Sequence, residues 1–151
     1  MKELDWASWS NRSVSPALGD CLFTFAVIAD THVDREGFPS ASPFPVNELS
    51  NARTRYCFED VKRLQEELGD MTPEFAMHLG DVVHPIPALP AYVTAAKDAH
   101  DIMDDLQIPM YLVPGNHDVG DKPMEYAPAG VVRDEYLALW EEHFGAQYQS
   151  F

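Results

Sequence analysis

Residues 22–32 read LFTFAVIADTH, an apolar run rich in aromatic and β-branched residues that ends abruptly in three polar ones. Such a run predicts a β-strand over residues 22–29, buried on both sides as strands of a parallel sheet are. Two shorter apolar runs follow Pro73 and Pro109, and they predict strands over residues 75–79 and 110–113. The sequence therefore predicts at least three strands.

Helical patterns separate and follow these strands. Apolar residues recur at helical spacing in three segments, two of which end before a glycine: residues 50–68, 91–106 and 134–144. The order β-α-β-α-β-α predicts an α/β fold with a parallel sheet, flanking helices and right-handed crossovers. Residues 1–20 show no such periodicity, so we expect a loose amino-terminal arm, followed by one domain over residues 21–151.

The charge of the chain narrows its partners. Among 151 residues, 10 basic side chains stand against 25 acidic ones, for a formal net charge of −15. A field of that sign repels nucleic acid and anionic membranes, so we expect neither as a general partner. The longest apolar run, residues 21–29, is far shorter than the about 18 residues that span a bilayer. Cys21 and Cys57 suggest neither a disulfide framework nor a zinc ribbon, which favours a reduced, cytoplasmic setting.

A polar cluster follows each predicted strand directly. The clusters are Asp30-Thr31-His32, Gly80-Asp81 and Gly115-Asn116-His117-Asp118. In open parallel sheets, ligands bind beyond the carboxyl ends of the strands. We therefore expect the three clusters to converge on one edge of the sheet.

The residue types in these clusters suit metal ions. Asp30 and His32 are two positions apart, so on an extended segment they point the same way and can share one ion. Oxygen and imidazole donors together favour Mn, Fe or Zn over Ca or Mg. Asp81 has two carboxylate oxygens that can bridge a metal pair about 3.5–4 Å apart. Asn116 offers a neutral oxygen to the second ion.

The remaining polar residues can act on a substrate. His117 is left free to face it, and Asp118 can orient or charge the His117 ring. His84 is either a contact at the rim of the site or a loop residue beside Pro85. Arg53 is either a ligand for a substrate phosphate, which guanidinium matches, or a solvated charge on its helix.

The motifs D-x-H, G-D and G-N-H-D, in this order, resemble those of the calcineurin-like metallophosphoesterase family, and the resemblance covers about residues 23–118. His84, together with the Gly120-Asp121-Lys122-Pro123 segment, is most similar to the calcineurin-like phosphoesterase-domain-containing serine/threonine phosphatases. The resemblance thus implies a metal-dependent phosphoesterase of the phosphomonoesterase or protein phosphatase type. Cyclic-nucleotide or other phosphodiesterases of the same family are the alternative.

The resemblance also implies roles for individual residues. Asp30 and His32 would bind the first of two divalent ions (Mn, Fe or Zn), Asp81 would bridge both, and Asn116 would bind the second. A metal-bound hydroxide would attack the phosphoester substrate. His117, helped by Asp118, would stabilise the transition state or protonate the leaving group; these last two are the expected catalytic residues.

The family fold is a four-layer α/β/β/α sandwich with further histidine ligands on later strands, including a G-H-x-H motif. After Asp118 this chain has one more histidine, His143, inside a predicted helix. We therefore expect the chain to resemble the first half of the sandwich, truncated at its carboxyl end. A catalytically incomplete fragment is accordingly the third interpretation.

Overall fold

A computed structural model describes most of the chain. The described residues are 20–40, 45–120, 131–148 and 150. The expected amino-terminal arm, apart from Asp20, lies outside this part, as does the Asp121-Lys122-Pro123 stretch.

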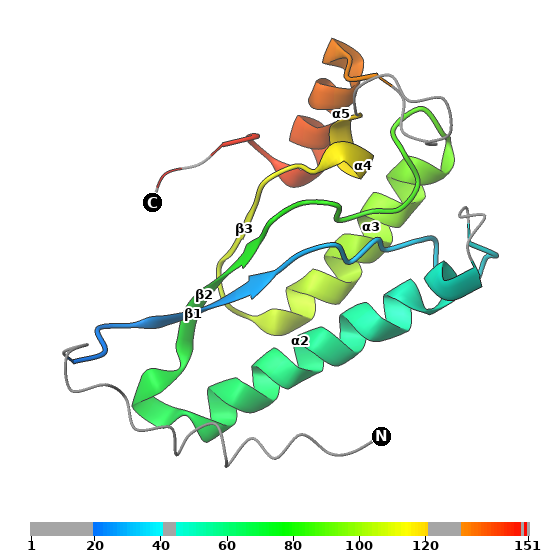
Figure 1. Ribbon diagram of the computed structural model, residues 1–151. Coiled ribbons are helices and arrows are strands. Elements are labelled where there is room, and N and C mark those ends of the chain that lie inside the picture. Colours follow the sequence, from blue (N-terminus) through cyan, green and yellow to red (C-terminus); the bar gives the residue numbers. More distant parts are fainter. Residues whose placement is uncertain (1–19, 41–44, 121–130, 149, 151) are drawn as a thin grey trace.

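A three-stranded parallel sheet carries the described part of the fold (Figure 1). Its strands are β1 (Thr24–Ile28), β2 (Pro73–His78) and β3 (Met110–Leu112), in the spatial order β1-β2-β3. The predicted α/β class, with a parallel sheet and flanking helices, is confirmed.

The three helical segments that the sequence pattern predicts are all present, and the described residues also form three short helices that it did not predict, at residues 45–49, 69–71 and 116–119. They are η1 (Pro45–Leu49), α2 (Ser50–Glu67), η2 (Gly69–Met71), α3 (Ala91–Met103), η3 (Asp104–Leu106), α4 (Asn116–Val119) and α5 (Asp134–Phe144). Gly69 and Gly145, which follow α2 and α5, have φ values of +54° and +87°. Glycine adopts this left-handed conformation without steric cost, which explains why both helices end there.

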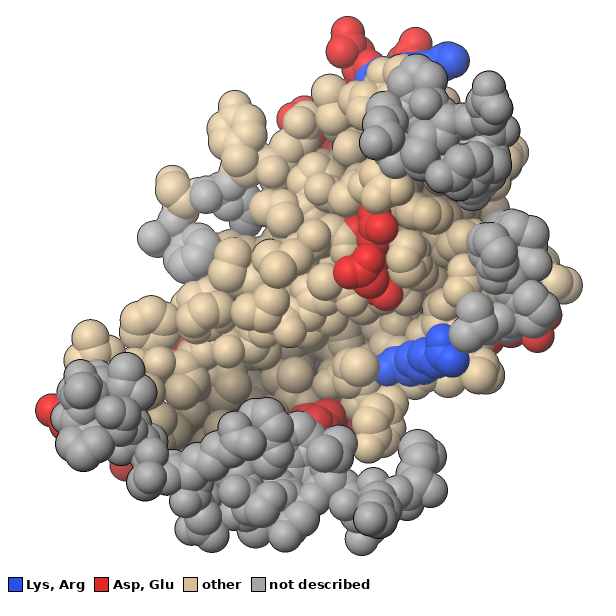
Figure 2. Space-filling view, viewed as in Figure 1, with Lys and Arg blue, Asp and Glu red and all other residues tan. Residues whose placement is uncertain are grey.

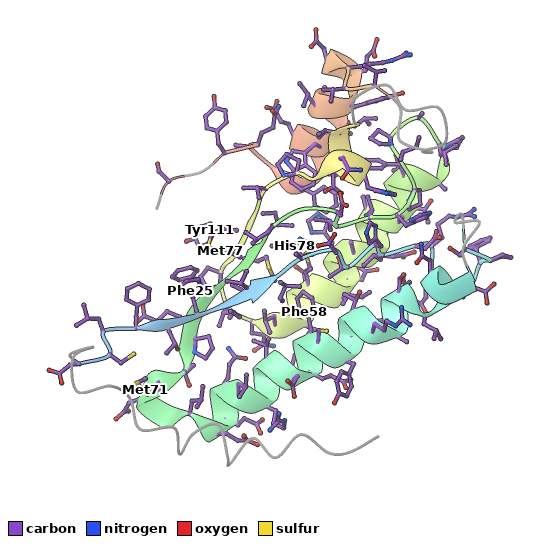
Figure 3. All side chains as sticks on the ribbon, viewed as in Figure 1. Phe25, Phe58, Met71, Met77, His78 and Tyr111 are labelled. Carbon is purple, nitrogen blue, oxygen red and sulfur yellow. The ribbon has the colours of Figure 1, made fainter. Side chains whose placement is uncertain are left out.

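The core lies on one face of the sheet, between β2 and the two long helices α2 and α3. Ala76 of β2, Phe58 of α2 and Tyr92 of α3 are almost fully buried together, and Figure 3 shows Phe58 turned from α2 toward the sheet. Right-handed crossovers between strands in the order β1-β2-β3 place consecutive helices on the same face. Trp140 of α5 is completely buried in the same cluster.

The opposite face of the sheet is open among the described residues, so the expected burial of residues 22–29 on both sides is wrong. Phe25 and Val27 are 46% and 53% exposed. The ring of Phe25 stacks on Phe75 at 5.2 Å, and Phe75 contacts Tyr111 edge-on at 5.8 Å. Figure 3 shows Phe25, Met77 and Tyr111 on the side of the sheet away from α2. The composition of β1 predicted a strand buried on both faces, but the strand order places both crossover helices on one face and leaves the other uncovered.

The three strands end level with one another. Ile28 pairs with His78, and His78 pairs with Leu112. Backbone pairing continues beyond the ends of β1 and β2. The backbone N–H of Asp30 donates to Gly80 O (3.0 Å) and that of Val33 to Val82 O (2.8 Å). The polar clusters therefore begin at the same edge of the sheet, as predicted.

Charged side chains are unevenly spread over the surface that Figure 2 shows. A small group of acidic side chains lies in the middle of an otherwise largely uncharged area, over the segments that follow β1 and β2. Within the described residues, none of the helices combines the length and the apolar character needed to cross a bilayer.

Candidate metal centre

Three residues of the first two motifs have an unusual backbone conformation. Asp30, His32 and Asp81 have φ values of 56°, 47° and 54°. Residues with a β-carbon rarely adopt this left-handed region, and doing so costs about 1–3 kcal/mol each. The extended geometry expected for Asp30 and His32 is therefore wrong, because the segment turns at each of them. The first, second and third loops are the segments that follow β1, β2 and β3. Hydrogen bonds from the first loop to the second hold the turns in place, including His32 N–H to Asp81 O at 3.0 Å.

These turns bring three polar side chains together. His32 Nε2 lies 3.9 Å from Asp30 Oδ1 and 3.8 Å from Asp81 Oδ2. One ligand atom from each of the three residues lies within 4.8 Å of the other two. Two carboxylates and one imidazole at this spacing form a donor set that fits a divalent transition-metal ion.

Asp81 connects this cluster to the third motif. Its Oδ2 faces His32, whereas its Oδ1 accepts the backbone N–H of His117 at 2.9 Å. The glycines between the two loops allow this approach. A β-carbon on Gly115 would lie 2.2 Å from Asp81 Oδ1, and one on Gly80 would lie 2.6 Å from Gly115 N. The carboxylate of Asp81 therefore extends from the first motif to the third.

Asp118 has a different set of contacts from the one that we expected. Its fully buried carboxylate accepts backbone N–H groups of Gly115 (2.8 Å), Val82 (3.0 Å) and Val83 (3.2 Å). Burial raises the pKa of Asp118 to about 6, although these three donors oppose the shift. The predicted contact with the His117 ring is thus replaced by contacts that join the second and third loops. Asn116, at the start of α4, is exposed.

The His117 ring is oriented by a main-chain group instead. Its Nδ1 lies 3.1 Å from the carbonyl oxygen of His84. A carbonyl only accepts hydrogen bonds, so Nδ1 carries the hydrogen and Nε2 faces elsewhere. His84 itself is 7% exposed, so this residue belongs to the interior of the site rather than to its rim.

Three imidazoles meet beside the carboxylates. Ring centroids lie 4.7 Å apart for His32 and His117, 5.2 Å for His84 and His117, and 5.9 Å for His32 and His84. Burial lowers the pKa of both His32 and His84, with the neighbouring His117 as the second cause. The sequence analysis singled out each of these histidines as a candidate site residue, but no local pattern indicated that they form one cluster.

A buried histidine supports the first two loops from beneath. Gly80 N–H donates to His78 Nδ1 (3.2 Å), so His78 Nε2 carries the hydrogen and donates to Thr31 Oγ1 (3.0 Å). The Thr31 hydroxyl in turn donates to Val82 O at 2.9 Å. Burial lowers the pKa of His78 to about 4, which keeps its ring neutral. Sequence reasoning missed the role of Thr31, whose position within the D-x-H motif was the available signal.

Arg53 lies exposed in the first turn of α2. The next residue, Thr54, is buried, and its hydroxyl donates to Ser50 O (2.8 Å) while also lying 3.3 Å from Thr31 O. A contact between Arg53 and a substrate phosphate stays a prediction.

Comparison with known proteins adds two findings. The family model described as calcineurin-like phosphoesterase matches residues 23–149. The chain is also similar to proteins named serine/threonine-protein phosphatase CPPED1. It is 36% identical over 73 residues to that of Bos taurus (45% of this chain, 23% of the relative) and 30% identical over 95 residues to that of Danio rerio (58% and 28%). The match thus spans about a quarter of the length of these curated relatives.

Proposed function

We propose, since this chain belongs to the calcineurin-like phosphoesterase family, that its polar cluster is a dinuclear metal centre at which a phosphate ester is hydrolysed. The observation that carries the proposal is the carboxylate of Asp81, whose two oxygens face the first and the third motif. A carboxylate in that position is suited to serve two ions at once.

Each ligand has a place in the proposed centre. Asp30 and His32 hold one ion, Asp81 holds both, and Asn116 holds the other. The mixed donors favour Mn, Fe or Zn. Bound ions of this kind supply positive charge that polarises phosphoryl oxygens and lowers the pKa of water.

The remaining residues act on the substrate or position those that do. His117, oriented by the carbonyl of His84, donates a proton from Nε2 to the leaving oxygen of the ester. Asp118 is a positioning residue, because its carboxylate holds the second and third loops against each other. Asp118 therefore contributes through geometry rather than through the His117 ring.

For the substrate, we propose a phosphomonoester such as a phosphorylated serine or threonine side chain. The similarity to relatives named serine/threonine-protein phosphatases supports this class. Phosphodiesters are the competing class, and substrate preference separates the two.

The decisive experiment combines metal content with activity. The metal-free protein is loaded with Mn²⁺, Fe²⁺ or Zn²⁺, and bound metal is measured by atomic absorption beside hydrolysis of p-nitrophenyl phosphate and bis-p-nitrophenyl phosphate. Asp81→Asn should lose more metal and activity than Asp30→Asn. Asp101→Asn is the matched control, since Asp101 is exposed on α3 and pairs with Lys97. Two ions retained by Asp81→Asn, or hydrolysis that persists in chelator, would refute the proposal; faster cleavage of the diester would refute the monoester class.

A further inference from the structure

The three imidazoles of the site come from three separate loops. His32 follows β1, His84 follows β2 and His117 lies in α4, after β3. One ring nitrogen of each lies within 4.8 Å of a ring nitrogen of the other two. In a tetrahedral zinc site with Zn–N bonds of about 2.0–2.1 Å, ligand nitrogens are about 3.3 Å apart. The rings thus have to approach one another by no more than about 1.5 Å, which side-chain rotations supply.

The surroundings of these rings match those of metal-binding histidines. A ligating histidine usually donates its other ring N–H to a carbonyl or carboxylate, and His117 Nδ1 does so to His84 O. His84 is more than nine-tenths buried, yet its Nδ1 has no hydrogen-bond partner among the described residues, and the same holds for His32 Nδ1. Buried polar atoms are rarely left without a partner, so these two nitrogens call for one.

We propose that His32, His84 and His117 form a second metal position that takes Zn²⁺-like ions and inhibits the enzyme. Its donors are all imidazole nitrogens, which suit Zn²⁺, Cu²⁺, Ni²⁺ and Co²⁺ and bind Mn²⁺ or Mg²⁺ poorly. The neighbouring position formed by Asp30, His32 and Asp81 is rich in oxygen and accepts Mn²⁺. The two positions share His32 but differ in selectivity, because the imidazole position takes Zn²⁺ and binds Mn²⁺ poorly, whereas the carboxylate position accepts either ion.

Inhibition follows from the engagement of His117. Once its Nε2 coordinates an ion, that nitrogen no longer carries a proton for the leaving oxygen. This consequence rests on the proposed function, whereas metal binding by the three imidazoles does not.

Metal-free protein titrated with Co²⁺ tests the binding directly, because four-coordinate Co²⁺ absorbs visible light strongly. The titration is carried out in the Asp81→Asn background, which disables the carboxylate position while the asparagine oxygen still accepts the His117 N–H. We expect Co²⁺ binding with the spectrum of a four-coordinate, nitrogen-ligated ion. Adding His84→Ala should weaken that binding by about 100-fold or more, since even residues outside the coordination shell contribute 10–100-fold. His100→Gln is the control for loss of a histidine elsewhere.

Equal Co²⁺ affinity with and without His84 would overturn the metal position. For the inhibitory role, added Zn²⁺ should suppress the Mn²⁺-supported hydrolysis of the wild type and spare that of His84→Ala, each relative to its own rate in Mn²⁺ alone. Equal suppression of both would overturn that role. If no variant hydrolyses any ester, the proposed function fails, and the Co²⁺ titration still decides whether the imidazole position exists.

Discussion

Gly115→Ala tests whether the contact between the second and third loops shapes the metal centre. The added methyl group would lie 2.2 Å from Asp81 Oδ1 and 2.4 Å from Asp81 N. The carboxylate can swing aside, but the backbone nitrogen cannot, because its neighbours are held by the bonds from His32 N to Asp81 O and from Val82 N to Asp118. Reaching ordinary contact at 3.4 Å requires Asp81 N to move by about 1 Å.

The magnitude of the effect follows from that displacement. Overpacking of this kind costs about 1–3 kcal/mol of unfolding free energy. A misplacement of about 1 Å typically costs about 10²-fold in catalytic rate. We expect a loss of similar size in metal affinity, of about one to two orders of magnitude, because the same carboxylate is displaced. Gly115 itself has a φ of −100°, which alanine tolerates, so backbone strain does not contribute.

Gly145→Ala is the matched control. Gly145 has a φ of +87°, but a β-carbon there meets no described atom within 4 Å. The ψ of Gly145 is −166°, and this combination of dihedral angles is essentially limited to glycine, so alanine should cost about 1–3 kcal/mol through its backbone alone and leave metal affinity unchanged. Urea denaturation and calorimetric metal titration give both quantities for each variant. Wild-type metal affinity in Gly115→Ala, or equal losses of affinity in the two variants, would refute the reasoning.

Three other predictions follow from the structure. His117→Ala, assayed with Mn²⁺, should lower kcat by about 10²–10⁴ with little change in bound metal; metal lost in step with activity would make His117 a ligand of the Mn²⁺ centre. Because burial lowers the pKa of His78 to about 4 from 6.5, the unfolded chain takes up its proton first, and this residue should remove about 3 kcal/mol of unfolding free energy as the pH falls from 6.5 to 4. The raised pKa of Asp118 acts in the opposite direction below about pH 6, in the wild type and in His78→Gln alike. Urea denaturation of metal-free His78→Gln should therefore show a loss of unfolding free energy on acidification that is smaller than the wild-type loss by the contribution of His78. A pH dependence equal to that of the wild type would contradict the prediction. The open apolar sheet face should make the 151-residue chain self-associate in sedimentation experiments, and Phe25→Lys should reduce this where Tyr56→Lys, on exposed α2 surface, does not.

Much of the fold was predictable from local patterns. Hydrophobic periodicity and the glycines after the helices located α2 and α5 almost to the residue, and the apolar runs located the strands. Such signals depend on residues within a few positions of one another. The burial of Phe25 and Val27 was predicted wrongly, because it depends on which face of the sheet the distant helices cover.

The candidate site divides in the same way. Asp30, His32 and Asp81 were placed at one edge by a general property of parallel sheets, and the structure brings them together. Their left-handed backbones, and the contacts of Asp118 with backbone N–H groups instead of the His117 ring, were not predictable. Both arise from contacts between loops that are more than thirty residues apart in the sequence. One example is the hydrogen bond between Val82 and Asp118, which are 36 positions apart.

By itself, then, the sequence determined which residue types stand at the carboxyl end of each strand, and so which chemistry is available to the chain. Only the tertiary structure decided how these residues meet: Asp81 between two motifs, His84 inside an imidazole cluster, and one apolar sheet face left open. The physical reason is that backbone propensity acts along the chain, whereas the close approach of Gly80 to Gly115 depends on how whole elements pack.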